Sequence, residues 1–314
     1  MVRVDRAGEI QFSRAYGLAN RALAIPNSDD TAFALASGTK AFTALAVLSL
    51  VQDGVLGLKT RARELLGGDL PLIDDTVKFE MLLAHRSGIG DYLDEEAGWD
   101  VNEHVLPVPV HTLADTESFL PVIDGYPQAF APGQRFAYCN GGFIVLALLA
   151  ERAAGIFFHD LVDERVCRPA RLSDTAFLRS DELPGRAAIG YLAAEGNRSN
   201  LLHMPVRGTG DGGIYSTAAD LSRFWNALFA RHIVDRQTLA LMTAPRSDVP
   251  SEGCRHGLGL WLHATGPAVL LEGFDPGMSM RSTHDPTSGL TVTVLANTSS
   301  GAGPLIAHLA PLFD

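Results

Sequence analysis

The sequence predicts an α+β fold, with an antiparallel sheet flanked by helices and a second, mainly helical subdomain. Short segments in which apolar and polar residues alternate, as they do in β-strands, are found at the start of the chain and again in its last third. Long apolar segments with helical character lie between them. Because the strand segments come from both chain ends, we expect a discontinuous sheet domain over residues 1–60 and 205–314. The mainly helical subdomain then covers residues 61–204, with the active site between the two.

The first sixty residues indicate a hairpin followed by a long apolar helix. The segments Val2–Arg6 and Ile10–Ser13 are separated by a turn at Gly8, which is typical of two paired strands. After a polar loop, an apolar run follows Ser37 until a glycine stop. We therefore expect a helix from Ser37 to about Gln52.

The middle of the chain alternates between helices and loops. Apolar spacing predicts helices at 76–84 and 142–153. A Ser-Thr capping pair at 216–217 predicts a third helix that runs to about Phe229. Weak periodicity and turn-forming residues predict loops with short helices over 91–135, and a loop over 179–212.

The last third predicts strands and a final helix. The strand segments follow one another closely, so antiparallel neighbours are expected. The strands are expected at 256–261, 268–272, 278–283 and 290–297, and the helix at 303–313.

Composition and charge exclude several classes of partner. The 314 residues carry a net charge of −11, which argues against nucleic acid or an anionic membrane as a partner. The three cysteines form no metal or disulfide pattern, and the ten histidines include no His-Glu-x-x-His motif, so no cofactor is expected. No apolar signal core opens the chain. We expect a cytoplasmic protein, although a removed signal segment would look the same.

The strongest chemical signal is Ser37-Gly38-Thr39-Lys40, at the start of the long apolar helix. Residues three apart on a helix lie about 5–6 Å from each other, so Lys40 can reach the Ser37 hydroxyl. A desolvated lysine can help to remove the serine proton, and a helix N-terminus provides N–H groups for a developing oxyanion. Chance alone would produce this spacing about 0.2 times in a chain of this composition.

A second candidate element is Tyr138-Cys139-Asn140, which precedes an apolar helix. On an extended chain the side chains of Tyr138 and Asn140 point the same way, and Cys139 points away. A phenolate favoured by a nearby ammonium can accept the nucleophile's proton, and Asn140 can hydrogen-bond to Lys40. Taken alone, a packed loop tyrosine with a hydrogen-bonded hydroxyl is the commoner interpretation.

Together these motifs resemble the first and second motifs of the serine β-lactamase-like superfamily. This superfamily includes class C β-lactamases, D-alanyl-D-alanine carboxypeptidases, D-aminopeptidases and family VIII carboxylesterases. Further similar segments occur in the same order at 17–21, 82–89, 132–138, 212–221 and 256–259. The resemblance covers nearly the whole chain and implies a β-lactamase/transpeptidase-like fold.

The resemblance also implies an acyl-enzyme mechanism that needs no cofactor. Ser37 would attack the carbonyl, and Tyr138, assisted by Lys40, would take the serine proton and later return it. Asn140 would position Lys40 and the acyl group. The backbone N–H groups of Ser37 and Phe274 would form the oxyanion hole.

The third motif departs from the family pattern. It is normally Lys-Thr-Gly, Lys-Ser-Gly or His-x-Gly, and counting back from Pro276-Gly277 places Leu271-Glu272-Gly273 there. Gly273 keeps a close backbone approach to substrate, but Leu271 can neither bind a substrate carboxylate nor stabilise the base. This loss favours neutral esters over anionic lactams.

Other chemically able residues have more ordinary interpretations. Cys139 points away from the motif, His85 is expected to be a structural helix-end histidine, and Glu272 a solvated strand residue. Arg281 and His308 could replace the lost cation, but surface roles are expected for both.

The sequence therefore predicts a serine hydrolase acting on small esters, with a small-molecule ester or amide as its substrate. Two alternatives stay open. A β-lactamase or D-amino-acid peptidase would take its cation from outside the third motif, and a non-catalytic ligand-binding relative would keep the fold without the chemistry. Acyl chain length, leaving group and oligomeric state are not determined by the sequence.

Overall fold

Strands from both ends of the chain form one large antiparallel sheet. The structure is a computed structural model that describes residues 1–93, 101–103 and 105–313. The sheet has eight strands in the order β2-β1-β12-β11-β10-β9-β8-β7. Their bounds are β1 Val2–Arg6, β2 Glu9–Arg14, β7 Ser247–Val249, β8 Cys254–His256, β9 Trp261–His263, β10 Val269–Asp275, β11 Met278–Asp285 and β12 Leu290–Ala296. The first strand pairs with the last, with Val2 opposite Val294, so the two chain ends close the sheet together.

Most helices come from the middle of the chain. They are α1 Thr39–Gln52, α2 Arg63–Leu66, α3 Phe79–Leu83, α4 Leu120–Ile123, α5 Asn140–Ala154, α6 Phe158–Val162, α7 Arg168–Ala170, α8 Ala218–Phe229, α9 Arg236–Thr243 and α10 Gly303–Leu309. Four shorter strands form two small sheets, β3 Leu18–Asn20 with β4 Ile25–Pro26, and β5 Phe33–Ala34 with β6 Tyr215–Ser216.

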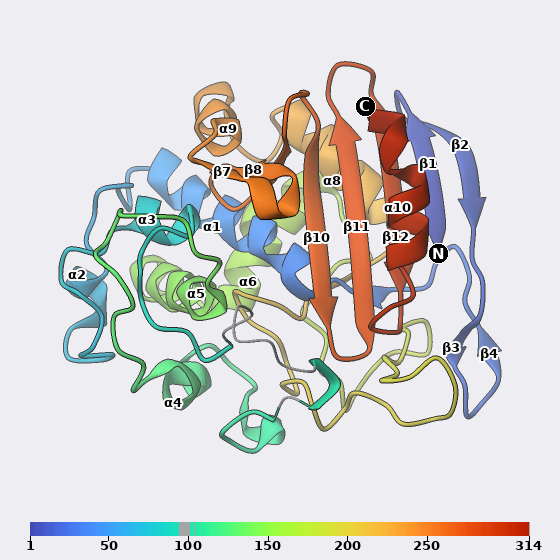
Figure 1. Ribbon diagram of the computed structural model, residues 1–314, viewed down its shortest axis with the longest axis horizontal. Coiled ribbons are helices and arrows are strands. Elements are labelled where there is room, and N and C mark those ends of the chain that lie inside the picture. The colour runs from blue at the N-terminus through green and yellow to red at the C-terminus, as the bar shows by residue number, and fades with distance from the viewer. Residues whose placement is uncertain (94–100, 104, 314) are drawn as a thin grey trace.

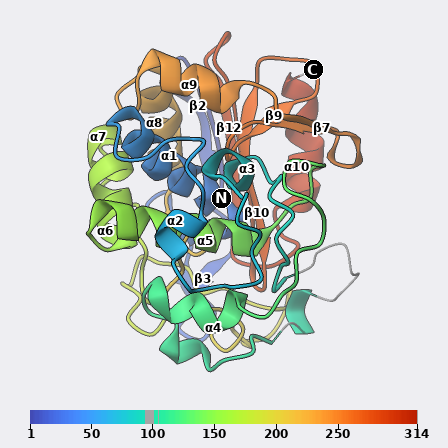
Figure 2. The same cartoon turned by 90° about the vertical axis from the view of Figure 1, so that its left-hand side faces the viewer.

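The sheet lies between two helical layers. Figure 1 shows α10 across one face of the strands and α8 behind the other face. Figure 2 views the sheet nearly edge-on, with α1 and α8 on one side and α10 on the other. The mainly helical region with α2 to α6 lies beside the α1 face. The domain boundaries near residues 60 and 205 stay a prediction.

Helix α1 is the centre of the core. Every residue from Thr39 to Leu50 is buried, as expected for a helix that is apolar on nearly all sides. It packs against α5 on one side, and the Phe42 ring lies 4.8 Å from the Phe224 ring of α8. The serine-lysine motif is therefore attached to a rigid core helix.

The predicted α+β fold is confirmed, and two of the differences from the expected element boundaries concern segments that adjoin α1. Ser37 lies in a separate 3-10 helix, η1 Ala36–Gly38, directly before α1. The single strand predicted at 256–261 is wrong, because a turn separates β8 from β9. Gly259 in this turn has a φ of 73°, and a Cβ there would lie 2.2 Å from the Ala44 Cβ, so the chain bends where it meets α1.

Both long loop predictions are confirmed in the described residues. Residues 179–212, which the structure describes throughout, contain no named helix or strand. Within 91–135, the described part contains α4 and three short 3-10 helices: Val101–Glu103, Val110–Thr112 and Glu117–Phe119. Residues 94–100 and 104 lie outside the described residues.

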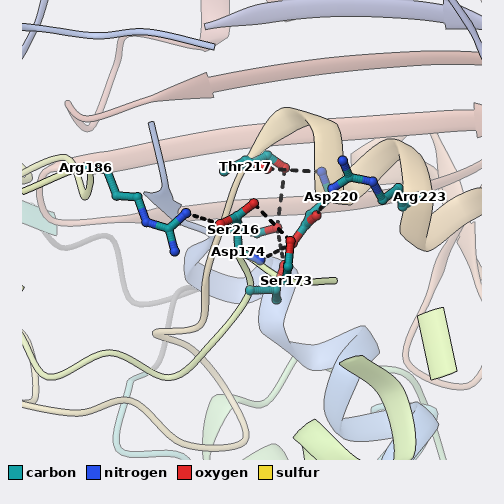
Figure 3. Close-up of polar contacts among 8 residues, drawn as sticks. Ser173, Asp174, Arg186, Ser216, Thr217, Asp220 and Arg223 are labelled. Atoms are coloured by element: carbon teal, nitrogen blue, oxygen red, sulfur yellow. Dashed lines mark hydrogen bonds and ion pairs between the residues drawn. The ribbon is translucent and has the colours of Figure 1, made fainter. Parts of the chain in front are cut away.

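A buried carboxylate connects the start of α8 to a neighbouring loop. The Thr217 side chain accepts a hydrogen bond from the Asp220 main-chain nitrogen at 3.1 Å, which caps α8. The Asp220 carboxylate accepts from the main chain of Asp174 and the hydroxyl of Thr175, both at 2.8 Å. It also pairs with Arg223, as Figure 3 shows. Thr175 Oγ1 also lies 2.8 Å from Ser216 Oγ, so the network links this loop to both β6 and α8.

Among the described residues, no single helix is long and apolar enough to cross a membrane. The bent pair formed by Asn140–Ala154 and Phe158–Ala170 meets the length and composition criterion only when its two parts are taken together.

Strand β10 contacts the η1 turn through Gly273. A Cβ built on Gly273 would lie 2.1 Å from the carbonyl oxygen of Leu35 and 3.0 Å from the main-chain nitrogen of Gly38. Only glycine allows this approach, because the nearest atoms belong to the backbone and cannot rotate away. The third-motif glycine thus sets the distance between the sheet and Ser37.

We predict that Gly273→Ala destabilises the protein by about 3 kcal/mol, because the added methyl group forces the strand away from the turn. Urea unfolding measures this difference. Gly185→Ala is the matched control, since a Cβ at Gly185 has nothing within 4 Å. Equal stability of the two variants would contradict the close approach.

Candidate active site

The candidate nucleophile lies in a tight turn. Ala36, the residue before Ser37, has a φ of 46°, a left-handed conformation that is uncommon for alanine. The turn is held on both sides, because the Leu35 nitrogen donates to the Ile214 oxygen at 2.9 Å, and Thr39 Oγ1 donates to the Ala36 oxygen at 2.7 Å. Strained turns that the surrounding structure enforces occur often at functional sites.

Lys40 is buried, and its side chain hydrogen-bonds to three residues in the described part of the chain. Its Nζ donates to Ser37 Oγ at 2.8 Å, to Asn140 Oδ1 at 2.7 Å and to the main-chain oxygen of Asp211 at 2.8 Å. These acceptors come from η1, the start of α5 and the loop before β6. A buried ammonium is tolerated when its protons are hydrogen-bonded, and three acceptors match its three protons.

Asp91 holds Asn140 in position. Asn140 is the first residue of α5, and the Asp91 carboxylate accepts from the main-chain nitrogens of Asn140 at 2.6 Å and Gly141 at 2.8 Å. A carboxylate is favoured at a helix N-terminus, where it satisfies free N–H groups. Burial raises the pKa of Asp91 to about 6, and the N–H groups act in the opposite direction.

Tyr138 lies beside the serine-lysine pair. Its ring centre is 5.0 Å from Lys40 Nζ. The ring stacks on His85 at a centroid distance of 4.4 Å and on Trp261 at 6.0 Å. The structure therefore brings the four predicted catalytic residues together, and their chemical roles stay predictions.

The third-motif residues border the same site from β10. Leu271 is buried and lines a small cavity together with Ser37, Lys40 and Tyr138. Gly273 contacts η1, and Phe274 follows it in the strand, with its side chain 53% exposed. The oxyanion role of the Phe274 N–H stays a prediction.

Neither suggested replacement cation reaches the site. Arg281 on β11 donates to both Glu272 carboxylate oxygens at 2.7 Å, across the strand pair. His308 is exposed on α10, which covers the sheet on the side opposite α1. Glu272 is thus a partly exposed strand residue, as expected, and its carboxylate is paired with Arg281.

A larger cavity opens beside Ser37 and Asn140, and its charged groups are acidic. Asp211 and Asp275 line it, and its described lining contains no Lys, Arg or His. The Tyr92 hydroxyl donates to Asp211 Oδ2 at 2.5 Å, and burial raises the pKa of Asp211. Apolar side chains complete the wall, including Leu178, Met204, Val206 and Met278.

Cys139 has a structural position. Its buried Sγ accepts a hydrogen bond from the Gly142 nitrogen at 3.3 Å and caps α5. Burial raises the pKa of the thiol well above its usual range, which suppresses the reactive thiolate. Among the described residues, no group of three or more His, Cys, Asp or Glu side chains could hold a metal ion.

Sequence reasoning missed Asp91, Asp211 and Asp275. Each adjoins a segment that was singled out: Asp91 follows the segment 82–89, Asp211 precedes 212–221, and Asp275 follows Phe274. A carboxylate beside a glycine-rich motif segment is the signal that could have identified them.

Comparisons with known proteins agree with this geometry. A sequence model of the Beta-lactamase family matches residues 2–310. Esterase EstB of Burkholderia gladioli is 30% identical, over 98% of this chain and 88% of its own length. A penicillin-binding protein of Bacillus subtilis (strain 168) is 26% identical over 85% of this chain. The match spans only 60% of that relative's own length.

The structural similarity extends over the whole fold. The crystal structure of a penicillin binding protein from Bacillus halodurans has a TM-score of 0.92 and 35% sequence identity, and the match covers 99% of this chain and 96% of that chain. The family match, the esterase relative and this superposition all include the segments that carry Ser37, Lys40 and Tyr138. The chain therefore belongs to the Beta-lactamase family and has the fold of its serine hydrolases.

Proposed function

We propose that this protein is a serine hydrolase that cleaves small esters through an acyl-enzyme on Ser37. The observation that carries this proposal is the distance of 2.8 Å between Lys40 Nζ and Ser37 Oγ at a buried site. A serine hydroxyl needs an adjacent group that lowers the cost of losing its proton. Lys40 and Tyr138 supply this environment.

The hydrogen bonds of Lys40 support Tyr138 as the general base. All three protons of an ammonium group have acceptors at Lys40, which favours the charged form. A positive charge 5.0 Å from the Tyr138 ring favours the deprotonated phenol. Tyr138 would then accept the Ser37 proton and later return it to the leaving alcohol.

Stabilisation of the oxyanion would come from two main-chain N–H groups, of Ser37 and Phe274. The contact between Gly273 and η1 supports this pairing, because it brings β10 against the nucleophile turn. Asn140, held by Asp91, would keep Lys40 aligned through the reaction. Water then hydrolyses the acyl-enzyme and frees the serine.

The charge of the site favours esters over β-lactams or carboxylate-bearing peptides. Leu271 takes the place of the family's cationic residue, and Arg281 is paired with Glu272 instead. Asp275 adds negative charge to the larger cavity, and Asp211 adds less because burial raises its pKa. An anionic substrate would meet like charge there at low effective dielectric, which disfavours binding.

A second candidate function is the hydrolysis of esters or amides that carry an amino group. The same two aspartates favour it, because a carboxylate near the scissile carbonyl attracts a substrate ammonium. Asp275 lies on the same face of β10 as Leu271 and Gly273 by strand alternation. Its carboxylate lines the same cavity as Ser37.

We predict that the protein hydrolyses p-nitrophenyl butyrate, with little turnover of nitrocefin, and that Ser37→Ala lowers kcat at least about 1,000-fold. Release of p-nitrophenol measures the rate. Ser49→Ala is the matched control, because Ser49 is a buried serine of the adjoining helix α1 whose hydroxyl donates to the main-chain oxygen of Ala46. Strong nitrocefin turnover would favour a β-lactamase, and turnover that Ser37→Ala leaves unchanged would contradict the proposal. No turnover of either compound by the wild type would favour a ligand-binding protein.

We predict a charge preference among activated esters of similar size. A p-nitrophenyl ester with an acyl-chain trimethylammonium group should have a kcat/KM at least about tenfold above that of its carboxylate analogue. Asp275→Asn should narrow this ratio, whereas Asp124→Asn removes the same charge from an exposed position and should not. A preference for the anionic ester would show that a cation reaches the site.

A further inference from the structure

The two ring nitrogens of His85 have different roles. The side chain follows α3 and is 1% exposed. Its Nδ1 lies 3.0 Å from the main-chain nitrogen of Cys139, which can only donate. Nδ1 is therefore an unprotonated acceptor, and a neutral His85 carries its proton on Nε2.

The Nε2 atom of His85 is buried and has no hydrogen-bond partner in the described part of the chain. The side chain lines the small cavity that also contacts Ser37, Lys40, Tyr138 and His256. This cavity has space for about one water molecule. A buried N–H group without an acceptor costs free energy, so a water molecule that accepts from Nε2 is physically favoured.

His85 is kept uncharged by its surroundings. Burial lowers the pKa of His85 well below its ordinary value, and His256 and Lys40 act in the same direction. Protonation of Nδ1 would also break the contact with Cys139. Burial likewise lowers the pKa of His256 to about 4. The titratable groups around His85 and the small cavity are Lys40 on α1, Tyr138 and Cys139 before α5, His256 on β8, Glu272 on β10, and Asp91 beside Cys139.

We propose that His85 is a positioning residue: its Nε2–H holds a water molecule in this cavity and, through that water, favours the deprotonated Tyr138 that accepts the Ser37 proton. The inference rests on the proposed serine hydrolase function. His85 donates at Nε2, but it neither accepts a proton there nor becomes a cation. It therefore supports a phenolate without competing for the proton. The stacked contact at 4.4 Å also holds the Tyr138 ring in place.

Two substitutions distinguish the role of His85 Nδ1 as an acceptor from that of Nε2 as a donor. In His85→Asn, the amide can replace Nδ1 as the acceptor for Cys139, and asparagine tolerates the φ of 52° at this position. The Nε2 donor is lost. In His85→Gln, the longer side chain places an amide N–H near the Nε2 position, and the acceptor for Cys139 is lost instead.

The test is an ultraviolet titration of Tyr138, read as the absorbance difference between each protein and its Tyr138→Phe counterpart. In His85→Asn, we expect Tyr138 to deprotonate at higher pH than in the wild type. We also expect kcat/KM for p-nitrophenyl butyrate at neutral pH to fall about tenfold, mainly through kcat. His85→Gln should stay close to the wild type in both measurements. Unchanged titration in His85→Asn, or equal shifts in the two variants, would overturn the proposal.

A second measurement needs no substitution, in case the variants do not fold. Nitrogen-15 NMR of labelled histidines in the wild type should show His85 as a neutral Nε2–H tautomer from about pH 5 to about pH 9. A proton on Nδ1 or a charged ring in this range would overturn the proposal. If the wild type showed no ester turnover that depends on Ser37, the proposed function would be contradicted instead. The Tyr138 titration would still decide the role of His85.

Discussion

A charged ammonium group inside a protein core must be surrounded by acceptors, and Lys40 meets this requirement with oxygens from three distant segments. Ser37 lies before α1, Asn140 begins α5, and Asp211 lies in the loop before β6. If one of these acceptors were lost, a buried positive charge would keep an unsatisfied proton, at a cost of several kcal/mol. The need to satisfy this buried charge therefore places Ser37, Asn140 and the Asp211 loop around Lys40 Nζ.

The neighbouring elements supply the remaining constraints. Gly273 lets β10 approach the nucleophile turn closely, and the Asp91 carboxylate orients the first turn of α5. The result is a positive centre with aromatic and neutral histidine side chains on one side. On the other side lies a cavity with two aspartates. In the proposed function, this asymmetry of charge, together with Leu271 at the place of the third-motif cation, disfavours carboxylate-bearing substrates.

The sequence predicted the fold and the central contacts because both depend on local spacing. Ser37 and Lys40 are three positions apart on nearly helical chain, and the strands alternate in clear segments. The bend at Gly259 was missed because only contact with Ala44 of α1 requires it. Asp91, Asp211 and the unequal nitrogens of His85 were missed for a similar reason: each depends on a partner at least 50 residues away in the chain. One-dimensional patterns carry little information about such pairings.

The central claim is that Ser37 becomes acylated within this environment. The most direct measurement is peptide mass spectrometry after rapid acid quenching of a reaction with p-nitrophenyl pivalate, whose hindered acyl group slows hydrolysis of the intermediate. The account predicts one pivaloyl group on the peptide that contains Ser37, and no such adduct in Ser37→Ala. Stoichiometric acylation of a different residue, or labelling that persists in Ser37→Ala, would contradict it.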